Sequence, residues 1–181
     1  MSMLDKVVAA VTPTESEEAR GEARRKALAA AAPGDWLALV IDHHQQIEAA
    51  FAAVKNARTA MERRSAQKWL GVLLTGHANA EESVLYPALA LHDEKSHATT
   101  GYSEQATVKT EMAELEELDA MSQAYLEKLE HIRGAVAHHV FEEEGTWFLE
   151  LKEKAPGLDQ NKLTMRYKEE FDRYIGRDKA A

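Results

Sequence analysis

The sequence HANAEESVLYPAL begins at His77, and the sequence HVFEEEGTW begins at His139. Each of them places a glutamate four residues after its histidine, at Glu81 and at Glu143. In an α-helix, residues i and i+4 lie on one face roughly 6 Å apart, so each pair can direct an imidazole and a carboxylate at one point. The two segments therefore predict two helices that each carry a possible pair of metal ligands.

These pairs continue the apolar faces of their helices. Apolar residues recur at spacings of three and four, which is typical of a buried helical stripe. The stripes run through Leu70, Leu73 and His77, through Leu129, Ile132, Val136 and His139, and, in an earlier segment, through Leu37, Val40, His44, Ile47, Phe51 and Val54. Ionised carboxylates are rarely buried without a partner, because their desolvation is costly. A cation in the core would explain why Glu81 and Glu143 share these faces with histidines.

The spacing of the candidate ligands indicates two similar helical hairpins. His44 precedes His77 by 33 residues, and the position 34 residues before His139 is Gln105, on the stripe of another helix. At a rise of about 1.5 Å per residue, these four positions fall within one or two turns of the same depth. We therefore expect three histidines, two glutamates and one glutamine to meet at one level of a helical core.

Composition narrows the classes of function. The chain has 181 residues, a formal net charge of −9 and no cysteine. The negative charge argues against nucleic acid as a partner, and the lack of thiols restricts a metal site to His, Asp, Glu or Tyr ligands. No apolar run approaches the roughly 20 residues that a membrane span needs. The first residues do not have the pattern of a signal peptide, so a cytoplasmic location is expected.

Helix-favouring residues and sparse glycine and proline predict an all-α fold, an antiparallel up-down four-helix bundle with additional N- and C-terminal helices. We expect an N-terminal helical extension over residues 1–34, the bundle over 35–155, and a C-terminal helix within 156–181 that packs on the bundle. The polar stretch 92–101 is expected to be a loop. Expected helix starts are an N-cap at Asp35, a capping box from Thr59 to Glu62 and a cap at Ser122.

Several residues compete for the same roles. His43 is the rival of His44, and the phase of the apolar stripe favours His44. His138 is the rival of His139, and the phase of Ile132 and Val136 favours His139. The sequence also predicts surface positions for Glu82, Glu142 and Glu144 and solvent-facing histidines at His92, His97 and His131. Core positions are predicted for Trp36, Trp69, Trp147, Tyr167, Phe171 and Tyr174.

The sequence resembles the hemerythrin-like HHE cation-binding domain family. The resemblance lies in the series His44, then His77 with Glu81, then His139 with Glu143. The resemblance extends over about residues 35–151. It implies a four-helix bundle with a non-haem di-iron centre, in which His44 and His77 bind one iron, His139 binds the other, and Glu81 and Glu143 bridge the two.

The sequence departs from the family at one ligand position. The family has a histidine on the third helix, where this chain has Gln105. The missing donor leaves three alternatives open, namely Glu104, Tyr102 or water in its place. It also leaves open a single metal, or zinc or manganese instead of iron.

Three functions are consistent with these residues. The first is a non-haem iron protein that binds or senses dioxygen, nitric oxide or peroxide, or that handles iron. The second is a di-iron enzyme with peroxidase, catalase-like or oxidase activity. The third is a metal-free helical bundle that binds another protein, whose identity the sequence does not indicate. We favour the first, with His44, His77, Glu81, His139 and Glu143 as the predicted metal ligands, because the sequence shows no substrate pocket or acid–base group beyond these ligands.

Overall fold

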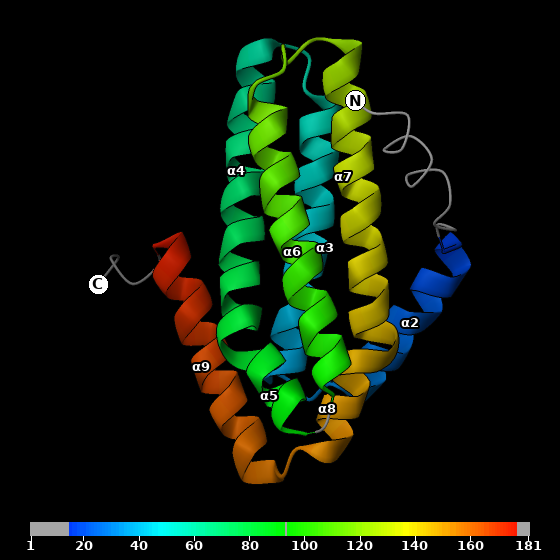
Figure 1. Cartoon of the computed structure of the whole chain (residues 1–181), viewed down its shortest axis with the longest axis vertical. Helices are drawn as coiled ribbons and strands as arrows, with labels where there is room; N and C mark the ends of the chain where they lie inside the picture. Colours follow the sequence, from blue (N-terminus) through cyan, green and yellow to red (C-terminus); the bar gives the residue numbers. More distant parts are fainter. Residues whose placement is uncertain (1–14, 93, 177–181) are drawn as a thin grey trace.

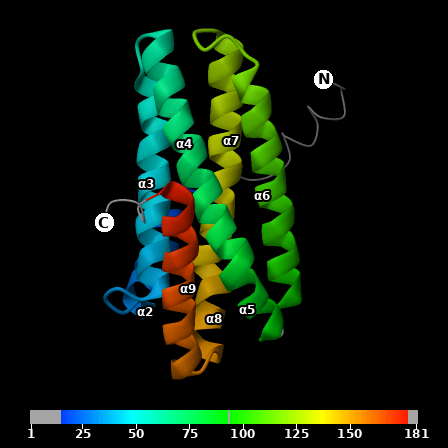
Figure 2. The same cartoon turned by 90° about the vertical axis from the view of Figure 1, so that its left-hand side faces the viewer.

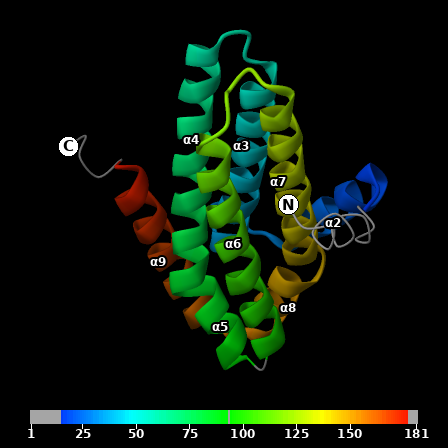
Figure 3. The ribbon, with the colours of Figure 1, turned by 45° about the horizontal axis from the view of Figure 1, so that its top comes forward.

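The computed structural model describes residues 15–92 and 94–176, and all the regular structure in that part of the chain is helical. Four long helices lie side by side in Figure 1, namely α3 (Trp36–Asn56), α4 (Ala60–Ala80), α6 (Lys95–Glu116) and α7 (Gln123–Glu142). The connection from α3 to α4 and the connection from α6 to α7 lie at the same end of this group (Figure 3). No helix within the described ranges is both long and apolar enough to cross a membrane.

Two further helices flank the four long ones. The helix α2 (Glu17–Ala30) packs near the end of α7 (Figure 1). The helix α9 (Gly157–Ile175) packs along α4 and α3 (Figure 2). Residues 1–14 and 177–181 of the expected terminal segments lie outside the described residues. Between the helices lies a continuous apolar core, which includes Trp36, Leu37, Ile41, Phe51, Leu70, Leu73, Leu85, Leu129, Ile132, Phe148 and Leu151.

The predicted helix starts are confirmed. The carboxylate of Asp35 accepts a hydrogen bond from the backbone N–H of Ala38 at 2.9 Å, which caps α3. Thr59 and Glu62 form both hydrogen bonds of a capping box at the start of α4. Ser122 caps α7 through its hydroxyl oxygen. These side chains satisfy N–H groups that have no partner within the helix, and so they fix where each helix begins.

Both helices that carry a His–Glu pair pass into a π-helical turn at the glutamate. These turns are η1 (Glu81–Leu85) and η2 (Glu143–Trp147), followed by α5 (Tyr86–Leu91) and α8 (Phe148–Lys154). The N–H of Tyr86 bonds the carbonyl of Glu81, five residues earlier. In π geometry the residue at i+5, rather than i+4, lies beneath residue i. The side chain that follows Glu81 on the inner face is therefore Tyr86.

The chain remains helical past Pro87, which lies at the start of α5 directly after η1. Proline has no N–H to donate, and the carbonyl of Glu82, five residues before it, accepts a hydrogen bond from the Tyr102 hydroxyl at 2.7 Å instead. The predicted loop over residues 92–101 is wrong over most of its length. The helix α5 ends at Leu91 and α6 already begins at Lys95, so Gly101 is a buried residue inside α6.

Trp36 and Trp147 are buried as expected, but the core positions predicted for Trp69 and Tyr174 are wrong. Trp69 is 49% exposed and Tyr174 is 46% exposed. The last turn of α9 lies against Gly76, where an added Cβ would be 3.1 Å from Ile175. Trp69 lies about two turns before Gly76 on α4, beyond the end of α9, so α9 does not cover it.

Candidate metal centre

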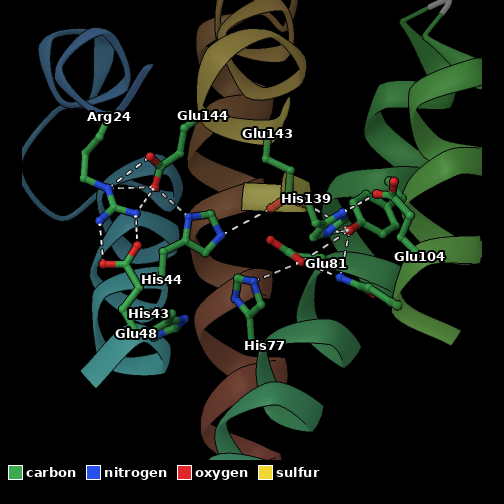
Figure 4. Close-up of polar contacts among 12 residues, drawn as sticks. Arg24, His43, His44, Glu48, His77, Glu81, Glu104, His139, Glu143 and Glu144 are labelled. Carbon is green, nitrogen blue, oxygen red and sulfur yellow. Dashed lines mark hydrogen bonds and ion pairs between the residues drawn. The ribbon is translucent and has the colours of Figure 1, made fainter. Parts of the chain in front are cut away.

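Four predicted ligands meet in the core between α3, the junction of α4 and η1, and η2. His44, His77, Glu81 and Glu143 each offer a donor atom, and these four atoms lie within 4.8 Å of one another. All four side chains are buried. In Figure 4 the two imidazoles and the two carboxylates point towards one another, with His44 and His77 on one side of the carboxylates and His139 on the other. The structure thus brings these four residues together as the sequence predicted.

The three core histidines are oriented in the same way. In each ring, Nε2 faces a buried carboxylate, at 3.3 Å from Glu143 for His44, 3.2 Å from Glu81 for His77 and 3.2 Å from Glu143 for His139. In each ring, Nδ1 lies within hydrogen-bonding distance of an outer oxygen, at 2.8 Å from Glu144 for His44, 3.1 Å from Tyr167 for His77 and 2.7 Å from Glu104 for His139. Metal-binding histidines have this arrangement, because the outer hydrogen bond fixes the ring and its tautomer.

The outer partner of His44 is itself held by an arginine. Arg24, on α2, donates to both carboxylate oxygens of Glu144 at 2.9–3.1 Å and also to Glu48. The predicted surface position of Glu144 is wrong, because its exposure is only 2%. The packing of α2 against η2 covers this carboxylate. The sequence does not show this burial, because Glu144 is the last of three consecutive glutamates and the residues that cover it are distant in the chain.

The side of the cluster near His139 contains a tyrosine that sequence reasoning missed. The hydroxyl of Tyr86 donates to Glu143 Oε1 at 3.0 Å and lies 3.1 Å from His139 Nε2. Gln105 Nε2 donates to this hydroxyl at 2.7 Å and to Glu81 Oε2 at 2.6 Å. Gln105 therefore lies at the predicted level and faces the cluster, but it acts here as a hydrogen-bond donor.

The other residues considered for the missing ligand position lie elsewhere. Glu104 is the outer partner of His139, and the Tyr102 hydroxyl donates to the backbone carbonyl of Glu82 at 2.7 Å. Of the rival histidines, His43 is buried against Tyr167 and Phe171 rather than in the cluster. His138 lies beside Glu15, with its Nδ1 2.5 Å from the carboxylate.

Burial and neighbouring charges shift the pKa values of the cluster. Burial disfavours a charged imidazole, but Glu143 and Glu144 outweigh it and raise the pKa of His44 to about 9. Burial and the charge of Glu143 together raise the pKa of Glu81 well above its usual range. Two carboxylates this close are costly to ionise together unless a positive charge lies between them. A cation among these donors would supply that charge.

The hydrogen bonds of the cluster provide an independent test of whether a cation fits. His44 Nε2, Glu81 Oε1 and Glu143 Oε2 are buried and make no hydrogen bond, although His44 Nε2 and Glu143 Oε2 face each other as an ion pair at 3.3 Å. A buried polar atom without a partner is costly, and an ionised one more so. All three atoms belong to residues of the four-ligand group, and imidazole nitrogen and carboxylate oxygen are donors for iron, manganese and zinc. The residues present therefore fit a metal ion.

A cavity of about 340 Å³ leads to the cluster between α4 and α6. Its lining includes the rings of His77 and His139 and the side chain of Gln105. Apolar side chains form much of the remaining wall, among them Ile47, Val108, Met112, Val136 and Val140. A small uncharged molecule can therefore reach the edge of the cluster without crossing the apolar core.

Comparison with protein families agrees with this geometry. The family described as hemerythrin HHE cation binding domain matches residues 36–151, which is more than half of the chain. Searches of curated proteins and of solved structures found no match. The matched range contains the four residues that meet in the core, together with His139.

Proposed function

Because the chain belongs to the hemerythrin HHE cation-binding family, we propose that it is a non-haem iron protein whose ion is held by His44, His77, Glu81 and Glu143. The proposal takes the four long helices as the antiparallel bundle of this family. His139 faces Glu143 from the opposite side of the carboxylates, where the family resemblance puts the ligands of a second iron.

The observation that carries the proposal is the set of three buried donor atoms without hydrogen bonds, His44 Nε2, Glu81 Oε1 and Glu143 Oε2. A hydrogen-bonded polar core would leave few such atoms. Two imidazoles and two carboxylates without a thiolate suit iron, with manganese and zinc as competitors. The outer contacts of Nδ1 in His44 and His77 support the same interpretation, because they orient both rings with Nε2 towards the four-residue group.

We further propose that the bound ion interacts with a small molecule, namely dioxygen, nitric oxide or peroxide. Iron(II) with an open coordination position binds such molecules. The cavity supports this proposal, because it ends at His77 and His139 and is lined largely by apolar side chains. Charged side chains also line it, namely Lys68, Glu104, Lys109 and Glu116, and the apolar part of its wall can admit a small neutral ligand.

Metal retention tests the first part of the proposal. The chelator-treated protein is loaded anaerobically with iron(II), desalted and assayed for iron. The Glu81→Gln variant should lose iron retention, since it removes a charged donor. Its matched control is Glu82→Gln, which neutralises the next residue, a partly exposed partner of Lys109, and should retain iron. Equal retention by both variants, or none by the unaltered protein, would refute the proposed site.

Ligand binding tests the second part. The iron-loaded protein is exposed in turn to dioxygen, nitric oxide and peroxide, and its visible absorption spectrum is recorded. A change that requires iron and disappears in Glu81→Gln is expected for at least one of them. An unchanged spectrum with all three would limit the function to iron handling.

The enzyme alternative differs in its readout. A cavity of about 340 Å³ falls in the range of small-ligand pockets, so it can also admit an organic substrate. Sustained consumption of peroxide or dioxygen with a co-substrate would favour a peroxidase or oxidase. A single stoichiometric spectral change would favour binding or sensing.

A further inference from the structure

The polar atoms of the cluster fall into two groups that differ in whether their charged atoms have hydrogen-bond partners. On the side of His44 and His77, His44 Nε2 and Glu143 Oε2 face each other as an ion pair at 3.3 Å, but neither atom makes a hydrogen bond. The Glu81 oxygen without a dashed line in Figure 4 points towards this side as well. On the side of His139, the charged groups already have partners. Among the residues that the structure describes, the buried atom without a hydrogen bond on that side is the amide oxygen of Gln105, which is uncharged and so calls for no cation.

The partner on the His139 side is the hydroxyl of Tyr86. It lies 3.1 Å from His139 Nε2, 3.0 Å from Glu143 Oε1, 3.4 Å from Glu81 Oε2 and 2.7 Å from Gln105 Nε2. An ion bound by His139 and both carboxylates would have to occupy the space between these same atoms. The hydroxyl oxygen therefore fills the position that a second ion needs.

The backbone around Tyr86 is built to admit its ring. The π turn η1 brings the fifth residue after Glu81 onto the inner face. Across from it, Gly101 of α6 leaves room for the ring, because a Cβ at Gly101 would lie 2.6 Å from Cζ of Tyr86. Tyr86 is fully buried, so the ring cannot be explained as a surface side chain that happens to fold inwards.

We infer that the protein binds one metal ion per chain, in the half of the cluster formed by His44, His77, Glu81 and Glu143. The side chain of Tyr86, admitted by Gly101, occupies the other half and excludes a second ion. This inference rests on the proposed function and specifies its stoichiometry. It also attributes the exclusion of a second ion to the Tyr86 ring rather than to the lack of a histidine at position 105.

Metal stoichiometry separates these causes. Each variant is titrated with cobalt(II), and separately with iron(II) under anaerobic conditions, and bound metal per chain is measured after desalting. The unaltered protein should bind one equivalent. Gln105→His should also bind one, because the ring remains in place. Tyr86→Ala combined with Gln105→His should bind two, because the space and the donor are then both present.

Two single variants keep the test decisive if the double variant does not fold. His139→Ala should still bind one equivalent, whereas His44→Ala should lose it. Two equivalents in the unaltered protein or in Gln105→His would overturn the inference, as would loss of the single ion in His139→Ala. No bound metal in the unaltered protein would instead refute the proposed function itself.

Discussion

Replacement of Gly101 by alanine tests whether the Tyr86 ring lies against α6 in solution. A Cβ at this position would be 2.6 Å from Cζ and 2.9 Å from Cε2 of the ring, closer than real Cβ contacts. The ring has little freedom to move away, because it is fully buried and its hydroxyl is hydrogen-bonded to Glu143. The backbone of α6 or the ring would have to shift.

Two opposing effects set the size of the change. Alanine in place of glycine inside a helix stabilises it by about 1 kcal/mol. Overpacking of a filled core costs about 1–3 kcal/mol. We therefore expect Gly101→Ala to lower the free energy of unfolding by about 0–2 kcal/mol. The matched control is Gly134→Ala in the middle of α7, where an added Cβ meets nothing within 4 Å. This control should raise the free energy of unfolding by about 0.4–1 kcal/mol.

Urea unfolding of the metal-free proteins, followed by far-ultraviolet circular dichroism, measures both free energies. The two variants should differ by about 0.4–3 kcal/mol, with similar slopes against urea concentration. In a Tyr86→Leu background, Gly101→Ala should lose most of its penalty, because the two sites are coupled through the ring. If Gly101→Ala stabilises the protein as much as Gly134→Ala does, the ring does not occupy this position.

Three further predictions concern metal, orientation and pH. At free iron(II) 100 times its dissociation constant, binding to the native state alone raises the free energy of unfolding by about 2.7 kcal/mol. This corresponds to a rise in Tm of about 5–11 °C for a chain of this size. A chelator should abolish the rise, and an equal Tm with and without iron would contradict the prediction. Tyr167→Phe removes the outer hydrogen bond of His77 and should weaken metal binding roughly 10–100-fold. A competition titration with a chromophoric chelator measures this affinity. An unchanged affinity would show that this bond does not orient the His77 ring. Burial opposes ionisation of Asp35, but hydrogen bonds from Lys152 and from the backbone lower the pKa of Asp35 below its usual value. The stabilisation that the ionised carboxylate provides is therefore complete above about pH 4 and is lost as the pH falls through the lowered pKa. The difference in free energy of unfolding between the unaltered protein and Asp35→Asn should therefore shrink below pH 4, and a constant difference would rule out this assignment.

The parts of the site that follow helical periodicity could be predicted from the sequence. His77 and Glu81 share a face because they are four residues apart, and the apolar stripe of their helix directs that face into the core. The same reasoning selected His44 over His43 from the phase of a stripe. Helix caps such as Asp35 were also readable, because they depend only on a few neighbouring residues.

The parts that depend on a change of helix type or on packing between distant segments could not be predicted in this way. Tyr86 is five residues after Glu81, so α-helical spacing turns it away from the cluster, and only the π turn brings it back. Gly101 was interpreted as part of a loop because it ends the polar stretch 92–101, whereas its lack of a side chain is what Tyr86 requires. Glu144 is buried through Arg24, which is 120 residues away in the sequence.

The two flanking helices are part of the site rather than additions to it. The family match ends at residue 151 and begins at residue 36, yet Arg24 on α2 and Tyr167 on α9 lie outside it. Arg24 holds the carboxylate that orients His44, and Tyr167 provides the hydroxyl beside Nδ1 of His77. Because outer partners of this kind tune both ring position and ligand basicity, the affinity of the half-site formed by His44 and His77 depends on segments that the family pattern does not include. The half of the cluster near His139 receives its outer partner, Glu104, from within the matched range. The outer contacts from α2 and α9 therefore support the half of the cluster that contains His44 Nε2 and Glu143 Oε2, two buried atoms without a hydrogen bond, and this is the half where a bound ion is expected.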